Sequence, residues 1–389
     1  MSLYNHKSVE KKWKEQVSSF VETTEYSGAA FEMAAGDDKE NEAAGAILVV
    51  VPDVEEEEWH VGHVRGLIAA QTMARFLTQQ QAGSKSEKVH LVITNEQNLK
   101  DLYDQNLLAV FTDIRKLVKQ ERLFDENRVR AERMQAVGRF TDIYGFEMSR
   151  VTDNALYVKD MVSDYGADAL NLYELYTGPL SQDSEWNEDG IEGIRRFLKR
   201  VYRLYSTFAE ENLGWVPKAS ENDEHGKPIV KVISSNEMDA CLYRVTKAVQ
   251  ERMSQWQFNT AVSSLMQGFK EIAAISKKQG GIDKKTLTGF AKILFPVAPH
   301  FVMELFEMLS ISDEEGVLSW PELQEPDKMP LTIPVKEGDK VIGRLQITKG
   351  MTESAVVNLA GEQEGRIAEA LAIAKRVIYV KDRILILIR

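Results

Sequence analysis

Residues 46–63 read AILVVVPDVEEEEWHVGH, and this stretch decides the fold. The apolar run at its start is typical of a buried strand, and the pattern that begins with HVGH is typical of a helix. The first N–H groups of a helix and the positive end of its dipole attract anions, and a glycine lets the backbone approach a ligand closely. Two imidazoles can also donate hydrogen bonds to developing negative charge. The stretch therefore predicts a strand–helix unit with a phosphate site at His60, Gly62 and His63.

The acidic run Glu55–Glu58 argues against this phosphate site. Each carboxylate about 6 Å from a phosphate charge costs roughly 0.7 kcal/mol in water, and several times more where the dielectric is lower. A structural alternative is that HVGH only caps and packs a helix. A divalent cation between His60 and Glu58 would reverse the repulsion, but there is no Cys/His cluster to support zinc. The sequence therefore predicts no metal site.

A second signal lies downstream, where residues 147–154 read EMSRVTDN and residues 162–174 read VSDYGADALNLYE. Here the chain resembles leucyl-tRNA synthetases, class I enzymes with a His-Ile-Gly-His motif and a later Lys-Met-Ser-Lys-Ser loop. The resemblance continues through GPL at 178–180, WNE at 186–188, FNTAV at 258–262 and PVAPH at 296–300. It is long and ordered from Glu147 to Arg389, and patchy before Glu147.

The resemblance implies a multidomain fold of the α/β plus α class. A reduced Rossmann-like layer with HVGH is expected at 1–145, and a connecting segment with the second motif at 146–186. A helical bundle of the anticodon-binding type is expected at 187–315, and a small C-terminal α+β domain of ββαββ order at 330–389. Only Val64–Phe146 separates the two motifs, which is too short for the rest of a catalytic sheet plus the family's editing domain.

The resemblance also assigns roles to residues of both motifs. If the chain is active, it implies catalysis by His60, His63 and Arg150, and binding of ATP with Mg²⁺ by His60, Gly62, His63, Met148, Ser149 and Arg150. The second motif departs from the family, since Glu147 stands where the first lysine is expected and Val151 where the last serine is expected. The lysines neutralise departing pyrophosphate in the family, so a glutamate there reverses the interaction and an arginine is not a neutral replacement.

The part of the chain that faces tRNA in the family keeps its basic residues. The resemblance implies tRNA contacts on the first bundle helix and in the last domain, at Arg195, Arg196, Lys199, Arg200, Arg203, Lys336, Arg344, Lys381 and Arg383. A solvated basic helix face is the structural alternative for the first five. Trp186, Trp215 and Trp256 are expected to be core or junction residues rather than platforms for bases.

Composition sets further bounds on function. The 389 residues, of which 43% are hydrophobic, suffice for two or three packed domains. One cysteine, Cys241, excludes an internal disulfide and suits a reducing cytoplasm. There is neither an apolar run long enough to span a membrane nor a signal-peptide core. The net charge of −12 is a mild argument against a dedicated nucleic-acid binder, although a local basic stripe can still bind RNA on an acidic protein. No DNA partner is expected.

Periodicity predicts the individual elements. We expect helices at 9–20, 107–120, 236–252, 258–277 and 353–374, and an apolar helical stripe from Ile191 to Leu204. A linker is expected at 316–330. Strands are expected at 46–52, 88–94, 331–335, 341–347, 377–380 and 384–388, with a turn at Glu337-Gly338-Asp339 joining the third and fourth.

Two functions from different classes follow. The first is a catalytically impaired relative of the synthetases that acts as a tRNA- or protein-binding module. The second is an active ligase that forms an aminoacyl-adenylate from ATP and leucine or another amino acid, for a tRNA or a non-RNA acceptor. HVGH favours the second function. The acidic run, Glu147 and the short interval between the motifs favour the first.

Overall fold

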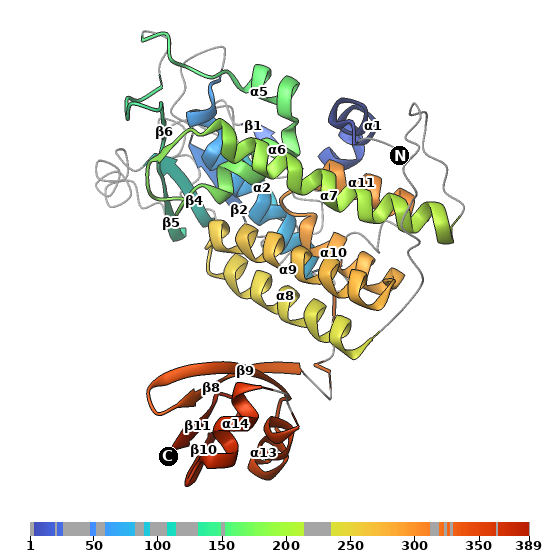
Figure 1. Ribbon diagram of the computed structural model, residues 1–389. Coiled ribbons are helices and arrows are strands. Elements are labelled where there is room, and N and C mark those ends of the chain that lie inside the picture. Colours follow the sequence, from blue (N-terminus) through green and yellow to red (C-terminus); the bar gives the residue numbers. More distant parts are fainter. Residues whose placement is uncertain are drawn as a thin grey trace, which may run out of the picture. The chain divides into compact units, whose positions relative to one another are not determined.

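A computed structural model describes most of the chain (Figure 1). The described residues are 4–19, 22–25, 47–51, 59–81, 89–93, 107–113, 131–148, 152–213, 235–311, 319–322, 325–326, 330–362 and 365–388. They form two compact units. One comprises Met1–Ile233 and Val245–Glu322, and the other comprises Ser234–Arg244 and Leu323–Arg389. The borders predicted at 145, 186 and 315 stay predictions.

A five-stranded parallel sheet lies in the N-terminal part of the first unit. Its strand order is β1-β3-β2-β4-β5. The strands are β1 Glu22–Glu25, β2 Ile47–Val51, β3 His90–Ile93, β4 Leu107–Asp113 and β5 Ala131–Val137. Leu48, Val49 and Val50 are buried because a parallel sheet covered on both faces takes near-continuous apolar strands. Helix α2, Val61–Gln81, packs on β2, β3 and β4. The predicted strand–helix unit is therefore confirmed.

The predicted helix at 107–120 is wrong for its first half, because Leu107–Asp113 forms β4. The run LLAVF fits a buried strand as well as a helix, and periodicity does not separate the two over so few residues. Strand β5 was not expected at all. The parallel sheet is consequently more complete than the sequence indicated. The remaining residues of that predicted helix, 114–120, lie outside the described part of the chain.

Helix α1, His6–Ser19, confirms the first predicted helix and packs on α11, Pro299–Met308. The indole Nε1 of Trp13 donates to Glu304 Oε2 at 2.8 Å, and Lys12 Nζ lies 2.9 Å from the same oxygen. Glu10 Oε1 accepts a hydrogen bond from the amide of Ala167 at 2.6 Å, at the start of helix α6, Ala167–Tyr176. The N-terminal helix therefore joins two elements that follow it by more than a hundred residues.

Helices α5, Val158–Tyr165, and α6, Ala167–Tyr176, connect the sheet to the bundle. Arg65 of α2 is fully buried beside the end of α6. Its guanidinium donates to the carbonyl oxygens of Glu174 at 3.2 Å, Gln182 at 2.7 Å and Gly178 at 3.3 Å. A short parallel pair, β6 Phe140–Thr141 and β7 Ser184–Glu185, lies in the same region. Trp186 is buried next to it, as the sequence predicted.

A helical bundle is present, as the predicted fold class requires. Its first helix, α7, carries the predicted apolar stripe, which is buried at Ile191, Ile194, Phe197, Leu198 and Val201. Asn187 caps this helix, with its side chain accepting from the amide of Gly190 at 3.0 Å. The bundle consists of α7 Glu188–Asn212, α8 Asn236–Ser254, α9 Phe258–Gln279, α10 Lys284–Leu294 and α11.

Trp256 lies at the turn between α8 and α9 and contacts the parallel sheet. Its ring stacks on Phe111 of β4 with centroids 5.3 Å apart, and the guanidinium of Arg133 on β5 lies 4.7 Å from its centre. The backbone of Trp256 has a φ of 63°, which is uncommon for a residue with a side chain. The predicted junction role of Trp256 is confirmed, while Trp215 lies outside the described residues.

The C-terminal unit has a four-stranded sheet of order β10-β11-β8-β9. Gly338, with a φ of 59°, forms the predicted turn between antiparallel β8 and β9. The helix predicted at 353–374 is two helices, and α14 begins after Gly365, whose φ of 102° interrupts helical geometry. The elements are β8 Pro330–Glu337, β9 Lys340–Thr348, α13 Glu353–Gly361, α14 Arg366–Ile373, β10 Arg376–Val380 and β11 Ile384–Ile388.

Within the described ranges, no helix combines the length and the apolar composition needed to cross a membrane.

Candidate functional site

The HVGH motif lies where parallel α/β sheets bind ligands. Strand β2 is flanked by β3 on one side and β4 on the other. The strand order therefore changes direction at β2, which makes it the topological switch point of the sheet. Ligands of such sheets bind at the carboxyl ends of the strands next to this switch point. Helix α2, which follows β2, begins at Val61 within the motif.

The first amides of α2 already have acceptors within the chain. Val61 N donates to the carbonyl of Leu156 at 2.9 Å, Gly62 N to His60 Nδ1 at 3.2 Å, and His63 N to the carbonyl of His60 at 2.9 Å. His60 is buried, and its ring lies against that of His63 with centroids 3.6 Å apart and the planes tilted by 32°. A phosphate would have to displace these acceptors. The described residues of this motif therefore fit a capped helix better than an ATP phosphate cradle.

The second motif is described only at its beginning. Glu147 forms an ion pair with Arg139, and its backbone pairs with Thr141. Met148 is buried. The carboxylate at the position of the family's first lysine therefore neutralises a cation of its own chain. The predicted site residues Ser149 and Arg150 lie outside the described residues, as do Glu55–Glu58.

Metal ligation has little support in the residues that the structure describes. No group of three or more His, Cys, Asp or Glu side chains there lies close enough together to hold a metal ion. Glu58, which would pair with His60 in the alternative cation site, lies outside those residues.

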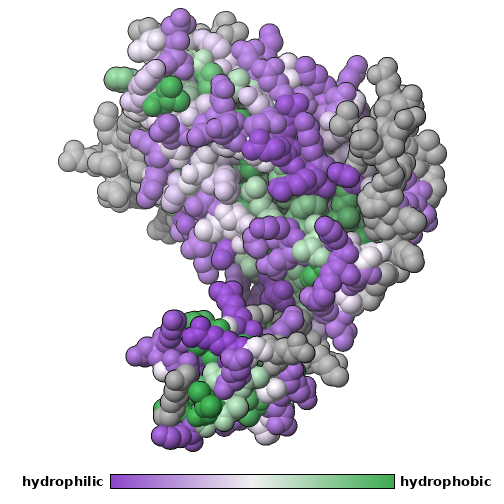
Figure 2. Space-filling view, viewed as in Figure 1, coloured by the Kyte–Doolittle hydropathy of each residue, from purple (hydrophilic) through white to green (hydrophobic). Residues whose placement is uncertain are grey.

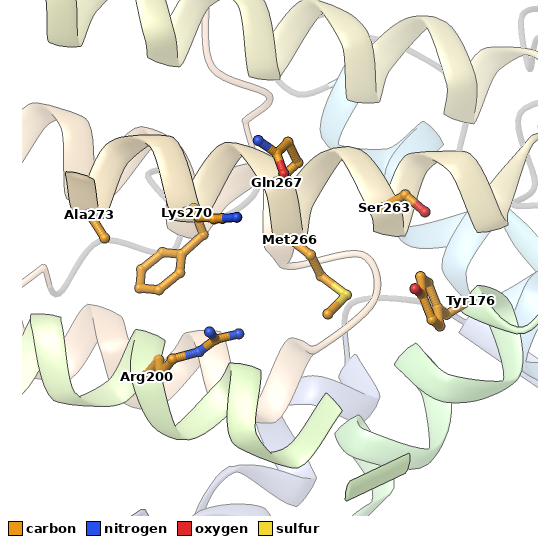
Figure 3. A pocket seen from close by; sticks show the side chains of 8 residues that line it. Tyr176, Arg200, Ser263, Met266, Gln267, Lys270 and Ala273 are labelled. Atoms are coloured by element: carbon orange, nitrogen blue, oxygen red, sulfur yellow. The ribbon is translucent and has the colours of Figure 1, made fainter. Parts of the chain in front are cut away.

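A surface groove runs between α7 and α9 and reaches the end of α6 (Figure 3). Its two neighbouring parts measure about 620 and 370 Å³ and share Tyr176, Arg200 and Met266. Tyr176 is 40% exposed, and Phe269 is buried beneath the groove. Volumes of this size are typical of small-ligand sites. Both parts lie within the first unit.

Four cationic side chains line this groove: Arg196, Lys199 and Arg200 from α7, and Lys270 from α9. None of them forms an ion pair with any described residue. Asp189 is the one acidic residue among those that line it. Figure 2 shows hydrophilic residues over α7, with hydrophobic ones between α7 and its neighbouring helices. A groove with this lining suits an anionic ligand that also has an apolar part.

The structure divides the basic residues that the sequence assigned to tRNA. Arg196, Lys199 and Arg200 share the groove, whereas Arg195 Nη1 lies 3.3 Å from Glu192 Oε2 of its own helix. Arg203 is exposed but does not line the groove.

The other four predicted residues belong to the C-terminal unit. Lys336 and Arg344 lie on strands β8 and β9, where their positions alternate with the buried core residues, so they lie on the sheet face away from α13 and α14. Lys381 and Arg383 are exposed in the turn between β10 and β11. The side chain of Asp382 between them accepts from the amide of Gly350 at 2.8 Å. The tRNA roles of all nine basic residues stay predictions.

Sequence reasoning missed Tyr176, Met266 and Lys270, which complete the groove. Met266 and Lys270 are four residues apart and share a face of α9, which the helical period could have shown. Nothing in the sequence indicated that this face lies opposite Arg200.

A partly buried cluster of titratable side chains joins α1, α6 and α11. His300 Nδ1 lies 2.9 Å from Asp168 Oδ1, and the amide of Phe301 donates to Asp168 Oδ2 at 2.6 Å. Burial and the nearby charge of Asp168 raise the pKa of Glu10 to about 7. Burial alone would lower the pKa of His300, but the charge of Asp168 and its hydrogen bond outweigh burial and raise it. This cluster lies where α1 contacts α6 and α11.

Part of the chain is similar to a known domain family. Residues 236–357 match the family model of the anticodon-binding domain of tRNA ligase. The structure is also similar to a leucyl-tRNA synthetase, agnB2 of Agrobacterium radiobacter K84, which was crystallised as a ternary LeuRS–tRNA–LeuAMS complex. The TM-score is 0.55 at 19% sequence identity, and the match covers 72% of this chain. It covers 37% of the synthetase chain, so the two share a fold over little more than a third of that protein.

Proposed function

We propose that this chain is a tRNA-binding protein related to aminoacyl-tRNA synthetases, and that it does not itself activate an amino acid. The observation that carries the proposal is the groove with Arg196, Lys199, Arg200 and Lys270, one wall of which is a helix of the matched anticodon-binding domain. A sequence with one cysteine, the buried Cys241, can form no internal disulfide, which is consistent with a reducing cytoplasm as its place of action.

Charge placement supports RNA as the ligand despite the net charge of −12. Cations without a carboxylate partner release counterions from a phosphate backbone when they bind it, which gives favourable and salt-dependent binding. The four groove cations on α7 and α9 form no ion pair with the residues that the structure describes. A local basic groove of this kind therefore suffices for phosphate contacts on an otherwise acidic protein.

The hydrogen bonds at HVGH support the second half of the proposal. Val61, Gly62 and His63 use their amides within the chain, and Glu147 neutralises Arg139. Electrostatic stabilisation needs donors that are free to meet the charge that develops in the transition state. The described parts of both motifs supply few such donors.

An active ligase is the second candidate function. One observation favours it: His60 and His63 lie at the start of the helix that follows β2, beside the switch point of a parallel sheet. Leucine-dependent ATP–pyrophosphate exchange decides between the two candidates, since only an adenylate-forming enzyme supports it.

The test of RNA binding compares two double charge reversals in the full chain. Arg196→Glu with Arg200→Glu removes groove cations, whereas Lys11→Glu with Lys14→Glu makes the same change of net charge on exposed positions of α1. We expect the first pair to weaken binding of unfractionated tRNA at low salt and the second to leave it nearly unchanged. Equal effects of the two pairs, or no salt-sensitive tRNA binding by the wild type, contradict the proposal. A protein partner for the bundle would then be the better account.

A further inference from the structure

Two glycines of α7 differ in what fills the space beside them. A Cβ at Gly190 would lie 2.7 Å from Tyr173 Cε2, so close packing explains that glycine. A Cβ at Gly193 would meet only Arg196 Nη2, at 3.7 Å, which is an ordinary contact. Neither packing nor an unusual φ therefore requires glycine at 193, and its missing side chain leaves open space in the groove that it lines.

The groove has different chemistry at its two ends (Figure 3). Arg200 and Lys270 supply positive charge from α7 and α9. Met266 extends from α9 on the side of Tyr176, and these two side chains offer a polarisable apolar surface. The part of the groove that Lys270 lines has no carboxylate among its lining residues, whereas Asp189 lines the other part.

We infer that the groove holds one unpaired nucleotide of RNA, with its base against Tyr176 and Met266 and its phosphate at Arg200 and Lys270. The inference rests on the proposed tRNA binding and adds the form of RNA that the groove accepts. Tyr176, Met266 and Arg200 line both parts of the groove, of about 620 and 370 Å³, and Lys270 lines the smaller one, so the two parts together accommodate a nucleotide. The cations Arg200 and Lys270 can bind the negatively charged phosphate, and Tyr176 and Met266 offer an apolar surface for the base.

An unpaired nucleotide fits this surface better than a duplex. Both faces of a base inside a duplex are covered by its neighbours, so only an unstacked base can lay a face on Tyr176. Stacking on aromatic side chains is the usual way in which proteins hold bases of loops and ends. Tyr176 is 40% exposed, which leaves ring surface available for such a contact.

The experiment uses the full chain and a single-stranded RNA hexanucleotide that contains 2-aminopurine, whose fluorescence changes when it stacks on a ring. Tyr176→Ala should lower the affinity for the hexanucleotide by about 5- to 150-fold, the range found for loss of one stacked base. Tyr176→Phe keeps the ring, so its affinity should stay close to that of the wild type. Tyr144→Ala is the matched control, because Tyr144 is 77% exposed and does not line the groove. A fully paired RNA of the same length should bind more weakly than the hexanucleotide.

Gly193→Leu separates filling of the groove from loss of charge. It adds a side chain to the open space and keeps every cation, so the 2-aminopurine signal should be lost while salt-sensitive tRNA binding persists. If Tyr176→Ala and Gly193→Leu leave the signal unchanged while tRNA still binds, the inference is wrong and the proposed function stands. A loss of signal in Tyr144→Ala equal to that in Tyr176→Ala also overturns the inference. If neither RNA binds to the wild type, the proposed function fails as well.

Discussion

The amide of Gly62 donates a hydrogen bond to Nδ1 of His60 over 3.2 Å. The central glycine of HVGH is therefore bonded to the first histidine of the same motif. A Cβ at Gly62 would lie 3.1 Å from Cε1 of that imidazole, so the ring also uses the space that the glycine leaves. A phosphate site here would need a free amide at Gly62 and open space beside its Cα. His60 uses both, because its Nδ1 accepts from the amide and its ring fills the space.

The first prediction concerns catalysis. Leucine-dependent ATP–pyrophosphate exchange should be at least about a hundredfold slower than in an ordinary synthetase, the cost expected for one lost donor to transition-state charge. The exchange assay measures this directly, with His63→Ala as the comparison. Exchange at a synthetase-like rate that His63→Ala abolishes would show that the chain is an active ligase.

The second prediction concerns the salt dependence of tRNA binding. Each phosphate contact contributes roughly −0.7 to −0.9 to the slope of log K against log salt. Arg196→Glu with Arg200→Glu should therefore reduce the steepness of that slope by about 2. Fluorescence anisotropy with labelled tRNA between low and physiological salt gives the slope. An unchanged slope would place the phosphate contacts outside the groove.

The third prediction concerns pH and stability. The folded-state pKa of Glu10, about 7, lies above the ordinary value of 4.5, so the folded protein holds a proton that the unfolded chain releases. Stability should consequently fall as the pH rises from 4.5 to about 7. The raised pKa of His300 acts in the same direction, since its contribution is full below the ordinary value of 6.5 and is lost as the pH rises through the folded-state value.

Glu10→Gln isolates this contribution. The glutamine keeps an oxygen that can accept from Ala167 and carries no charge next to Asp168. The variant should be more stable than the wild type at pH 8, and the difference should shrink at pH 5. Urea unfolding at both values measures it, with Glu15→Gln on the exposed side of α1 as the control. A difference that is independent of pH would show that Glu10 ionises in the folded protein as it does in water.

The fourth prediction concerns Arg65. Arg65→Ala should lower the free energy of unfolding by at least about 3 kcal/mol, because several buried carbonyl groups lose their donor. Arg65→Lys should also destabilise, since an ammonium cannot reach Glu174, Gly178 and Gln182 with the fork of a guanidinium. Denaturant unfolding checks both, and the exposed Arg203→Ala should change stability by less than about 0.5 kcal/mol. Near-wild-type stability of Arg65→Ala would mean that water or other groups replace the donor.

The sequence by itself determined the elements whose pattern is local. The run at 46–51, the stripe from Ile191 to Val201 and the alternation of the C-terminal strands each carry a period that has one structural meaning. The basic residues of α7 could also be placed on one helix from the sequence, because the helical period shows which residues share a face. The predicted helix at 107–120 failed because its apolar run is compatible with two periods, and only its place between β2 and β5 makes Leu107–Asp113 a strand.

The tertiary structure decided which residues act together. Arg65 is separated by more than a hundred residues from the carbonyl groups it holds, and Leu156 by nearly as many from the Val61 amide it occupies. Tyr176 and Lys270 reach the groove from α6 and α9, so no spacing along the chain joins them to Arg200. Contacts of this kind depend on how helices and strands pack, and packing is a property of surfaces that distant segments form together.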